Sequence, residues 1–361
     1  MVKPLVSAVI VNYNKRELTS KLLDSLKKTA FPKDKLEVIV VDNASSDGSV
    51  EFLRKKYPHA RVIANDRNAH WCEGVNMGVR ASRGKYVMLF DNDILADKNW
   101  LKELLKILEN DESVAVAGPL QFSKYKKFSD YTFEGYGTTT LVQFHSFLRG
   151  IDKHTKKPLD MFSVTGNFLF RRDLVDVPFD PDYRAYAEET YFCWLMRLRG
   201  YRAVEVPTAV LYHAGESTYG LKGLKGFAAK FGERNRLLNM FLFYSPANLI
   251  RMIPYFLFLG VFMNIYGIRK LPMRLGIYWY FVSNLRRLLI KRRSIQGQRK
   301  VNDREIIRLM SCNLFDESVF SNALMRFAVR VLNKLSYAYC FIAGIRTAEF
   351  FNQSFVYQKR A

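Results

Sequence analysis

Between residues 5 and 119, short apolar runs alternate with amphipathic segments, and this alternation limits the possible folds more than any other feature. The runs are LVSAVIV, LEVIVVD, ARVIA, KYVMLFD and VAVAGP. The stretches that separate them, such as RELTSKLLDSLKKT and EGVNMGVRASR, place apolar residues three and four positions apart, which is typical of helices with one buried face. The pattern predicts an α/β fold whose Rossmann-like sheet is mainly parallel, with right-handed crossovers.

Polar residues follow three of these runs where the strands are expected to end. NYN follows the first run (residues 12–14), DNASSDGS overlaps the end of the second (42–49) and DND that of the fourth (91–93). In parallel sheets, ligands bind outside the carboxyl ends of the strands. These three segments are therefore the first candidates for a binding site.

The segment FDNDILADKNW, residues 90–100, allows two interpretations. In the first it is a strand-to-helix turn, in which Asp97 caps the following helix while Asp91 and Asp93 accept hydrogen bonds from the backbone. In the second the two carboxylates hold a divalent metal, because Mg²⁺ and Mn²⁺ prefer hard oxygen ligands. Since a buried unpaired carboxylate is costly, we expect a cationic partner for Asp91 and Asp93.

Charge divides the chain into two parts. From Lys222 to the end there are 24 Lys and Arg against 6 Asp and Glu, a net charge of +18, which leaves +4 of the total +22 for the first 221 residues. Glycines at positions 220, 223 and 226 mark the break. We predict one domain over residues 1–225 and a basic, mostly helical region over residues 226–361.

The basic region is apolar and aromatic between its charges, which favours an anionic lipid surface over nucleic acid as its partner. Residues 237–250 and 252–268 lack charge and are separated only by Arg251. The second run contains Pro254 and Gly260 and is at the short end of the roughly 17–25 residues that a spanning helix needs. We expect helices that lie in the membrane interface or re-enter it. A helical subdomain buried against the first half is the alternative.

The cysteines and the N-terminus indicate a cytoplasmic protein. Cys72, Cys193, Cys312 and Cys340 show no metal or redox spacing, which favours reduced thiols. The N-terminal run LVSAVIV is interpreted as a strand and not as a signal peptide. We therefore expect a peripheral or monotopic protein at the cytoplasmic face of the cell membrane.

Eight segments share their order and spacing with one known family. They are VIVNYN, VVDNASSDGS, NAHWCEGVNMG, YVMLFDND, VTGNFLFRR, AEETYFCWLMRLRGY, VLYHAGEST and ERNRL, and KRRSIQGQR follows later. They resemble glycosyltransferase family 2, specifically its rhamnosyltransferase-like members with the GT-A fold. The resemblance implies an inverting glycosyltransferase with Mg²⁺ or Mn²⁺ as cofactor. It would move a sugar such as rhamnose from a nucleoside diphosphate donor to a saccharide or polyprenyl-linked saccharide.

The resemblance implies a nucleotide site at the ends of the first strands. Asn12, Tyr13 and Asn14 offer a ring to a base and amides to its edge, and Asp42 resembles the family's nucleotide-recognising aspartate. The implied set is Asn12, Tyr13, Asn14, Asp42, Asn68, Asn76, Asp91 and Asn92. A polar turn is the alternative for residues 12–14, and capping is expected of residues 43–49.

The segment NAHWCEGVNMG departs from the family at its third residue. A glycine is usual where His70 stands, whereas Gly74, Asn76 and Gly78 match. The larger side chain predicts that this loop approaches the donor differently. His70 is expected to contact the nucleotide or to be exposed, without a catalytic role.

The resemblance gives DND the meaning of a metal-binding DxD motif, whose cation bridges the donor diphosphate. Asp93 is the expected direct ligand, and Asp91 is expected to bind the ribose, the metal or its water. His213 resembles the histidine that completes the metal shell through a neutral nitrogen. A strand-end histidine bound to backbone is the alternative for His213.

The segment AEET carries the most consequential departure. Relatives commonly have Glu-Asp here with the second carboxylate as base, so Glu189 occupies the base position with one extra methylene. Asp and Glu have similar intrinsic basicity, so general-base chemistry remains feasible. The residues implied at the acceptor or donor sugar are Thr165, Gly166, Glu188 and Trp194. The alternative is that Glu188 and Glu189 only favour a helix N-terminus.

Three rival functions compete with this prediction. A sugar nucleotidyltransferase would show a glycine-rich phosphate loop after the first strand, which VNYNKRE lacks. A catalytically silent GT-A-like membrane adaptor is the remaining alternative, because AEET and NAH are altered. Nucleic-acid binding has no recognition motif to support it.

Overall fold

The computed structural model describes residues 4–124, 131–134, 138–141, 146–147, 156–215, 226–266, 268–315 and 321–351. The chain forms two compact units. Unit 1 comprises Met1–Gly135, His154–Met196 and Tyr201–Ala228. Unit 2 comprises Tyr136–Lys153, Arg197–Gly200 and Ala229–Ala361.

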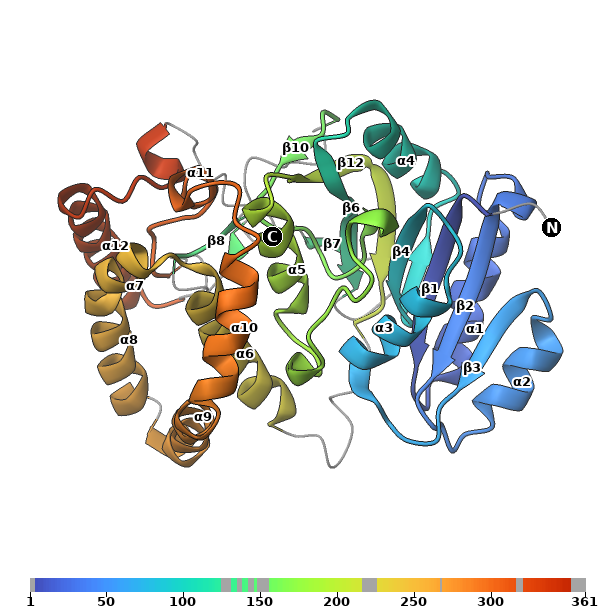
Figure 1. Cartoon of the computed structure of the whole chain (residues 1–361), viewed down its shortest axis with the longest axis horizontal. Helices are drawn as coiled ribbons and strands as arrows, with labels where there is room; N and C mark the ends of the chain where they lie inside the picture. The colour runs from blue at the N-terminus through green and yellow to red at the C-terminus, as the bar shows by residue number, and fades with distance from the viewer. Residues whose placement is uncertain are drawn as a thin grey trace. The chain divides into compact units, whose positions relative to one another are not determined.

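Unit 1 is an α/β unit in which strands and helices alternate over the first half (Figure 1). Its strands are β1 (Val6–Asn12), β2 (Leu36–Asp42), β3 (Ala60–Ala64), β4 (Tyr86–Asp91), β5 (Ile94–Ala96), β6 (Val114–Lys124), β7 (Tyr131–Glu134), β10 (Leu159–Asp160), β11 (Leu169–Arg171) and β12 (Arg202–His213). Its helices are α1 (Arg16–Lys27), α2 (Ser49–Lys56), α3 (His70–Ala81), α4 (Trp100–Asn110) and α5 (Glu188–Leu198). All five runs predicted as strands are confirmed.

The first four strands form the parallel half of the sheet, as predicted. The strand order is β10-β12-β6-β11-β4-β1-β2-β3, with β7 paired to β6 and β5 paired to β12. β1 pairs in parallel with both β2 and β4, and β2 with β3. The register places Asn12 beside Asp42. The carboxyl ends of β1, β2 and β4 therefore meet at one edge of the sheet.

The prediction of a mainly parallel sheet is wrong for the other half, which is mixed. β11 runs antiparallel to both of its neighbours, β4 and β6. β5 and β10 run antiparallel to β12. Strands as short as β5 and β11 give no periodic signal in the sequence.

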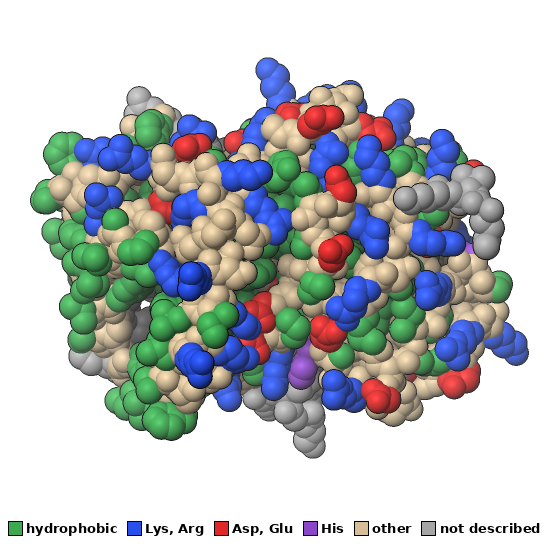
Figure 2. Space-filling view, viewed as in Figure 1, with side chains coloured by type: hydrophobic (Ala, Val, Ile, Leu, Met, Phe, Trp, Pro, Cys, Tyr) green, Lys and Arg blue, Asp and Glu red, His purple; other side chains and the backbone are tan. Residues whose placement is uncertain are grey.

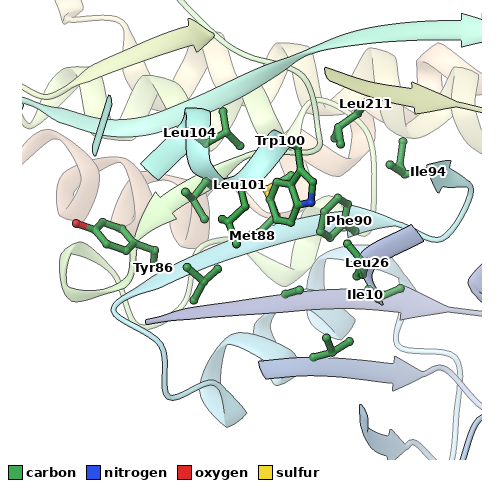
Figure 3. Packing of buried hydrophobic residues seen from close by; sticks show 14 of the residues in the cluster. Ile10, Leu26, Tyr86, Met88, Phe90, Ile94, Trp100, Leu101, Leu104 and Leu211 are labelled. Atoms are coloured by element: carbon green, nitrogen blue, oxygen red, sulfur yellow. The ribbon is translucent and has the colours of Figure 1, made fainter. Parts of the chain in front are cut away.

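One face of the parallel strands packs against α1, α2 and α4 (Figure 3). Ile10, Met88 and Phe90 point into this core. The Trp100 ring meets the Phe90 ring edge-on with 5.1 Å between centroids, and Trp100 Nε1 donates to Thr29 Oγ1 at 3.0 Å. Burying such a side chain contributes about 1.5–3 kcal/mol. The cluster therefore fixes the strands that end at the candidate site.

α3 covers the opposite face, and two of its glycines allow it to approach closely. A Cβ at Gly78 would lie 2.3 Å from Val9 Cγ1, and a Cβ at Gly74 would lie 3.0 Å from Val11 Cγ1. Val9 and Val11 alternate with Ile10 along β1, so they face away from α1. The glycines of NAHWCEGVNMG are thus packing residues that bring the start of α3 to the sheet edge.

Gly78→Ala is expected to lower the free energy of unfolding by about 1–2 kcal/mol, because overpacking outweighs the helix propensity that alanine adds. Gly276→Ala, in α9 of unit 2 (Leu271–Ser283), is the matched control, since nothing lies within 4 Å of a Cβ there. The control is expected to be neutral or stabilising. Urea unfolding of both variants measures the difference, and equal stabilities would contradict the packing role of Gly78.

Glu205 is buried in β12, and neither oxygen of its carboxyl group has a hydrogen-bond partner. Burial raises the pKa of this carboxyl well above its ordinary value of 4.5. Above pH 4.5 the unfolded chain loses this proton while the folded chain keeps it. The contribution of this group to the free energy of unfolding is therefore fully present below that pH. It falls by up to about 1.4 kcal/mol per pH unit as the pH rises towards the folded pKa.

Glu205→Gln is expected to flatten this decline, because an amide does not titrate. Urea unfolding at a series of pH values, from about 5 to about 8, measures the slope for the wild type and the variant. Glu51→Gln, at an exposed position on α2, is the control and should leave the slope unchanged. Parallel slopes for the wild type and Glu205→Gln would show that the carboxyl group is not held neutral.

Unit 2 is mainly helical, which confirms the prediction of a helical C-terminal region. Its helices are α6 (Phe227–Phe243, which starts in unit 1), α7 (Pro246–Arg251), α8 (Ile253–Tyr266), α9 (Leu271–Ser283), α10 (Leu285–Gln296), α11 (Asp303–Ile307) and α12 (Ala323–Ile342). A two-stranded hairpin of β8 (Thr138–Thr139) and β9 (Ser146–Phe147) accompanies them.

The segment KRRSIQGQR closes the C-terminal end of α6. Gln296 Nε2 donates to two backbone oxygens at 2.7 and 2.9 Å. Arg299 also donates to one of these two, the Phe243 oxygen, and Arg292 donates to the Phe241 and Tyr244 oxygens, so that all four carbonyl groups of residues 241–244 are bonded. The last carbonyl groups of a helix lack partners within the helix. This segment therefore has a structural role in unit 2.

The apolar run at residues 237–250 lies largely inside unit 2. Leu238, Met240, Leu242 and Phe243 are buried, whereas the side chain of Ile250 is exposed. Among the described residues, no helix combines the length and the apolar character needed to cross a bilayer.

Candidate active site

The loops beyond the strand ends of unit 1 contain strained backbone. Among the described residues, six other than glycine have positive φ: Asn14 (52°), Ala44 (61°), His70 (58°), Arg184 (59°), Tyr186 (73°) and Ala187 (60°). They follow β1, follow β2, open α3 and precede α5. Such conformations cost about 1–3 kcal/mol each and cluster at functional sites. Their grouping marks this edge of the sheet as the candidate site.

Hydrogen bonds join these loops to one another. Asn43 Nδ2 donates to the backbone oxygen of His70 at 2.9 Å. The backbone N–H of Cys72 donates to the backbone oxygen of Arg184 at 2.9 Å. The start of α3 thus connects the loop after β2 with the loop before α5.

The structure brings Asp91, Asp93 and His213 together, as the sequence predicts for a metal site. One ligand atom from each lies within 4.8 Å of the others. His213 Nε2 and Asp93 Oδ1 are 3.3 Å apart. The pairing of β5 with β12 explains this contact, because its register sets His213 opposite Ile94, the residue after Asp93.

Asp91 is held by two side chains that the sequence analysis did not single out. Trp71 Nε1 donates to Asp91 Oδ1 at 2.8 Å. Asn167 Nδ2 donates to Asp91 Oδ2 at 3.2 Å, and Asn167 Oδ1 accepts from the Asp91 backbone N–H at 2.7 Å. Trp71 lies in the segment NAHWCEGVNMG and Asn167 lies in VTGNFLFRR. Their place in these two family-like segments is the sequence feature that could have identified them.

The charges at this edge favour a bound cation. Burial, and then the nearby negative charge of Asp93, raise the pKa of the Asp91 carboxyl. A divalent ion would remove this repulsion, since opposite charge favours the ionised form. Two carboxylates and one imidazole are a donor set that suits Mg²⁺ or Mn²⁺. Asp91, Asp93 and His213 therefore fit the metal that the sequence implies.

Asn12 and Asp42 form a buried pair at the adjoining strand ends. Asn12 Nδ2 donates to Asp42 Oδ2 at 2.7 Å, and Asn12 Oδ1 accepts from Thr19 Oγ1 at 2.7 Å. Ser45 donates to both carboxylate oxygens of Asp42, each at 2.8 Å, through its backbone N–H and its hydroxyl group. In this structure the pair organises the loop after β2.

The other residues predicted to bind nucleotide are more widely placed. Asn92 Nδ2 lies 3.5 Å from Asn12 Oδ1, so Asn92 joins the same group. Asn14 Oδ1 accepts from the backbone N–H of Ser46 at 2.7 Å, and Tyr13 is half-buried beside it. Asn68 Oδ1 accepts from the backbone N–H of His70 at 2.8 Å.

Asn76 lies apart from this group, inside the protein. It is fully buried on α3. Its Nδ2 donates to the Phe179 backbone oxygen at 2.8 Å, and its Oδ1 accepts from the Phe179 backbone N–H at 3.1 Å. This pairing ties the segment before α5 to α3.

His70 has a left-handed backbone, which favours the glycine that the resemblance implies at this position. Its φ is 58°, in the region where a side chain is disfavoured. The ring stacks on Phe227 with 5.4 Å between centroids, which offsets part of this strain. Burial, and then the charge of Arg184, lower the pKa of its imidazole. The side chain therefore packs as a neutral ring.

The two acidic residues of AEET open α5. Glu188 is nearly buried, and its Oε2 has no hydrogen-bond partner. Burial, and then the charges of Glu189 and Asp91, raise the pKa of the Glu188 carboxyl well above its ordinary value. Glu189 is half-buried, and Thr190 Oγ1 donates to its Oε1 at 3.4 Å. The neighbours thus differ in environment, and burial favours the neutral form of the Glu188 carboxyl.

The residues predicted at the sugar divide into two groups. Gly166 lies beside the metal group, because a Cβ there would lie 4.0 Å from Asp91 Oδ2. Thr165 is buried next to it, and its Oγ1 donates to the Asn167 backbone oxygen at 3.3 Å. Trp194 is fully buried and meets the Phe162 ring edge-on at 5.4 Å. The structure therefore places Trp194 in the core.

Sequence comparisons show what this region is similar to. Residues 7–177 match the model of glycosyl transferase family 2. Glycosyltransferase AglE of Haloferax volcanii is 29% identical over 178 residues, which cover 48% of this chain and 54% of AglE. The poly(ribitol-phosphate) beta-N-acetylglucosaminyltransferase TarS of Staphylococcus aureus is 27% identical over 110 residues, which cover 30% of this chain and 19% of TarS. The matched region thus spans about half of AglE and a fifth of TarS.

Solved structures show the same fold. TarS residues 1–349 superpose with a TM-score of 0.52 at 16% identity, over 94% of this chain and 91% of that one. GalNAc-T7, solved with UDP, GalNAc and Mn²⁺, superposes with a TM-score of 0.55 at 16% identity, over 66% of this chain and 48% of that one. Over residues 7–177 the chain is therefore similar to glycosyltransferase family 2, and the superpositions and the mixed sheet show a GT-A-like α/β fold.

Proposed function

We propose that this protein is a metal-dependent inverting glycosyltransferase. The observation that carries the proposal is the group of Asp91, Asp93 and His213 at the carboxyl edge of a family 2 domain. In open α/β sheets this edge is where ligands bind. The strained loops and the carboxylates of α5 lie around the same edge.

Glu189 is the proposed general base. It takes the proton of the acceptor hydroxyl, whose oxygen attacks the anomeric carbon of the donor sugar. The bond from that carbon to the diphosphate breaks as the new bond forms, and this single displacement inverts the anomeric configuration. Glu188, held neutral by its surroundings, donates a hydrogen bond to a sugar oxygen at the same helix terminus.

Asp91, Asp93 and His213 would hold the Mg²⁺ or Mn²⁺ ion. When bound, such an ion stabilises the negative charge that grows on the departing diphosphate. Trp71 and Asn167 orient the Asp91 carboxylate from two sides. Asn12, Tyr13, Asn14 and Asp42 are proposed to border the nucleoside, with the buried pair Asn12–Asp42 shaping the loops around it.

The proposed donor is a nucleoside diphosphate sugar, with thymidine diphosphate rhamnose as the first to test. The proposed acceptor is a saccharide or a polyprenyl-linked saccharide in cell-surface glycan synthesis, at the cytoplasmic face of the cell membrane. The similarity to TarS, a poly(ribitol-phosphate) beta-N-acetylglucosaminyltransferase, supports a surface glycan as acceptor. The basic, apolar character of unit 2 supports the membrane location.

A panel of sugar nucleotides tests the proposal. The full-length protein is incubated with each donor, Mg²⁺ or Mn²⁺ and a polyprenyl saccharide extract, and nucleoside diphosphate release is measured. Release with one donor, dependent on both metal and extract, is the expected result. Nucleotide binding without release from any donor, with extract present, would instead favour the silent adaptor.

A further inference from the structure

We propose that the outward faces of α8, α9 and α12 form a docking surface for an anionic lipid bilayer. This surface rests on the membrane location proposed above and specifies which residues make the contact. Among the described residues, 23 large hydrophobic side chains are exposed, and all except Val177 lie between Ile250 and Phe351. In Figure 2, hydrophobic side chains gather over α8, α9 and α12.

α12 is an amphipathic helix whose apolar face points outwards. Leu324, Phe327, Val331 and Leu335 recur at three- and four-residue spacing, and they are between 40% and 73% exposed. A helix at a water-exposed surface normally turns its polar face outwards. The outward face of α12 is therefore suited to a hydrocarbon surface and not to water.

The inward face of α12 is polar and its hydrogen bonds are satisfied. Asn333 Oδ1 accepts from the Leu314 backbone N–H at 2.8 Å, and Asn333 Nδ2 donates to the Phe315 backbone oxygen at 2.9 Å. Ser336 Oγ lies 2.6 Å from the hydroxyl oxygen of Tyr255 on α8. These contacts fix which side of α12 faces the protein, so its apolar side cannot turn inwards.

α9 repeats this arrangement. Its inward residue Arg274 is 1% exposed, and its Nε donates to Glu233 Oε1 at 2.6 Å. Its outward residues include Trp279, 69% exposed, and Val282, 66% exposed. Asn264 Nδ2 of α8 lies 3.2 Å from the hydroxyl oxygen of Tyr278 on α9. α8 therefore adjoins both α9 and α12, and the three apolar faces belong to one surface.

The positive charge around the docking surface favours an anionic bilayer as its partner. Residues 234–302 and 318–348 contain no Asp or Glu. Arg326, Arg330 and Lys334 follow one another at four-residue spacing along α12. Cations beside an apolar helix face, with exposed Trp and Tyr, are typical of helices that lie in the interface of an anionic membrane. A second copy of this chain would bring like charges together, which disfavours self-association.

Vesicle binding by the full-length protein tests the surface. Phosphatidylcholine vesicles with and without phosphatidylglycerol are sedimented at low and high salt, without donor or acceptor. We expect binding to the anionic vesicles, weakened by salt. The double variant Phe327→Gln/Leu335→Gln is expected to bind about tenfold more weakly or worse. Val177→Gln, the exposed hydrophobic position in unit 1, should bind like the wild type.

Trp279 provides a second readout that does not depend on affinity. Trp100 and Trp194 are buried and Trp71 is half-buried in unit 1, so the emission of the exposed Trp279 should respond most to lipid. Anionic vesicles are expected to shift this emission to the blue, and brominated lipid is expected to quench it. Trp279→Phe should lose both responses while circular dichroism shows that the variant is folded.

Three results would overturn the docking surface. They are no binding to anionic vesicles, wild-type binding by the double variant, and a lipid-free dimer that the double variant dissociates. The last result would assign the surface to a second copy. Because none of these assays involves donor turnover, they fail or succeed independently of the proposed transferase activity.

Discussion

Asp93→Asn is expected to lower nucleoside diphosphate release by about a thousandfold, because it removes a direct ligand of the proposed metal and its charge. The amide keeps the size of the side chain at a position that is 6% exposed. The lower release is therefore not expected to result from unfolding of the variant. Steady-state release of nucleoside diphosphate at saturating donor measures the loss of turnover. Electron paramagnetic resonance measures the loss of Mn²⁺ binding by the same variant.

Asp66→Asn is the matched control for Asp93→Asn. Asp66 is exposed and lies outside the group formed with Asp91 and His213. The control should retain wild-type turnover and wild-type Mn²⁺ binding. Wild-type turnover by Asp93→Asn would remove the metal site from the mechanism, whatever the control shows.

Glu189→Gln is expected to lower the turnover number by about 10²–10⁴-fold, because an amide cannot take the acceptor proton. Donor binding should change little, since the substitution keeps the shape of the side chain. The turnover number, measured with saturating donor and acceptor, and the dissociation constant for the nucleoside diphosphate separate these two effects.

The neighbouring substitution Glu188→Gln provides the comparison for Glu189→Gln. Burial, and then the charges of Glu189 and Asp91, raise the pKa of the Glu188 carboxyl and so favour its neutral form. Glutamine is also neutral, so we expect a loss of only about tenfold. A larger loss for Glu188→Gln than for Glu189→Gln would transfer the role of base to Glu188.

Much of the secondary structure of unit 1 could be predicted from the sequence, because it depends on local patterns of apolar residues. The five β-rich runs are strands, and the amphipathic stretches between them form helices. Polar residues at successive strand ends predicted a site at the carboxyl edge, since parallel strands bring those ends together. The contact between Asn12 and Asp42 follows directly from the β1–β2 register.

The short strands in the mixed half of the sheet could not be predicted from the sequence. β5 and β11 have three residues each, too few for a period. Yet β5 holds His213 beside Asp93 through its pairing with β12. The resemblance to a family named His213, whereas only the sheet shows how a residue so far along the chain reaches the DND motif.

The sequence by itself determined five strands of unit 1 and the helices between them, the basic charge of the second half and the residue types of the metal group. These depend on local pattern and composition. Only the tertiary structure decided that Asn167 and Trp71 hold Asp91, that Asn76 and Trp194 are buried, and which face of α12 points outwards. Periodicity reveals that a helix has two faces, but the hydrogen bonds of Asn333 and Ser336 to distant segments select the one that faces the protein.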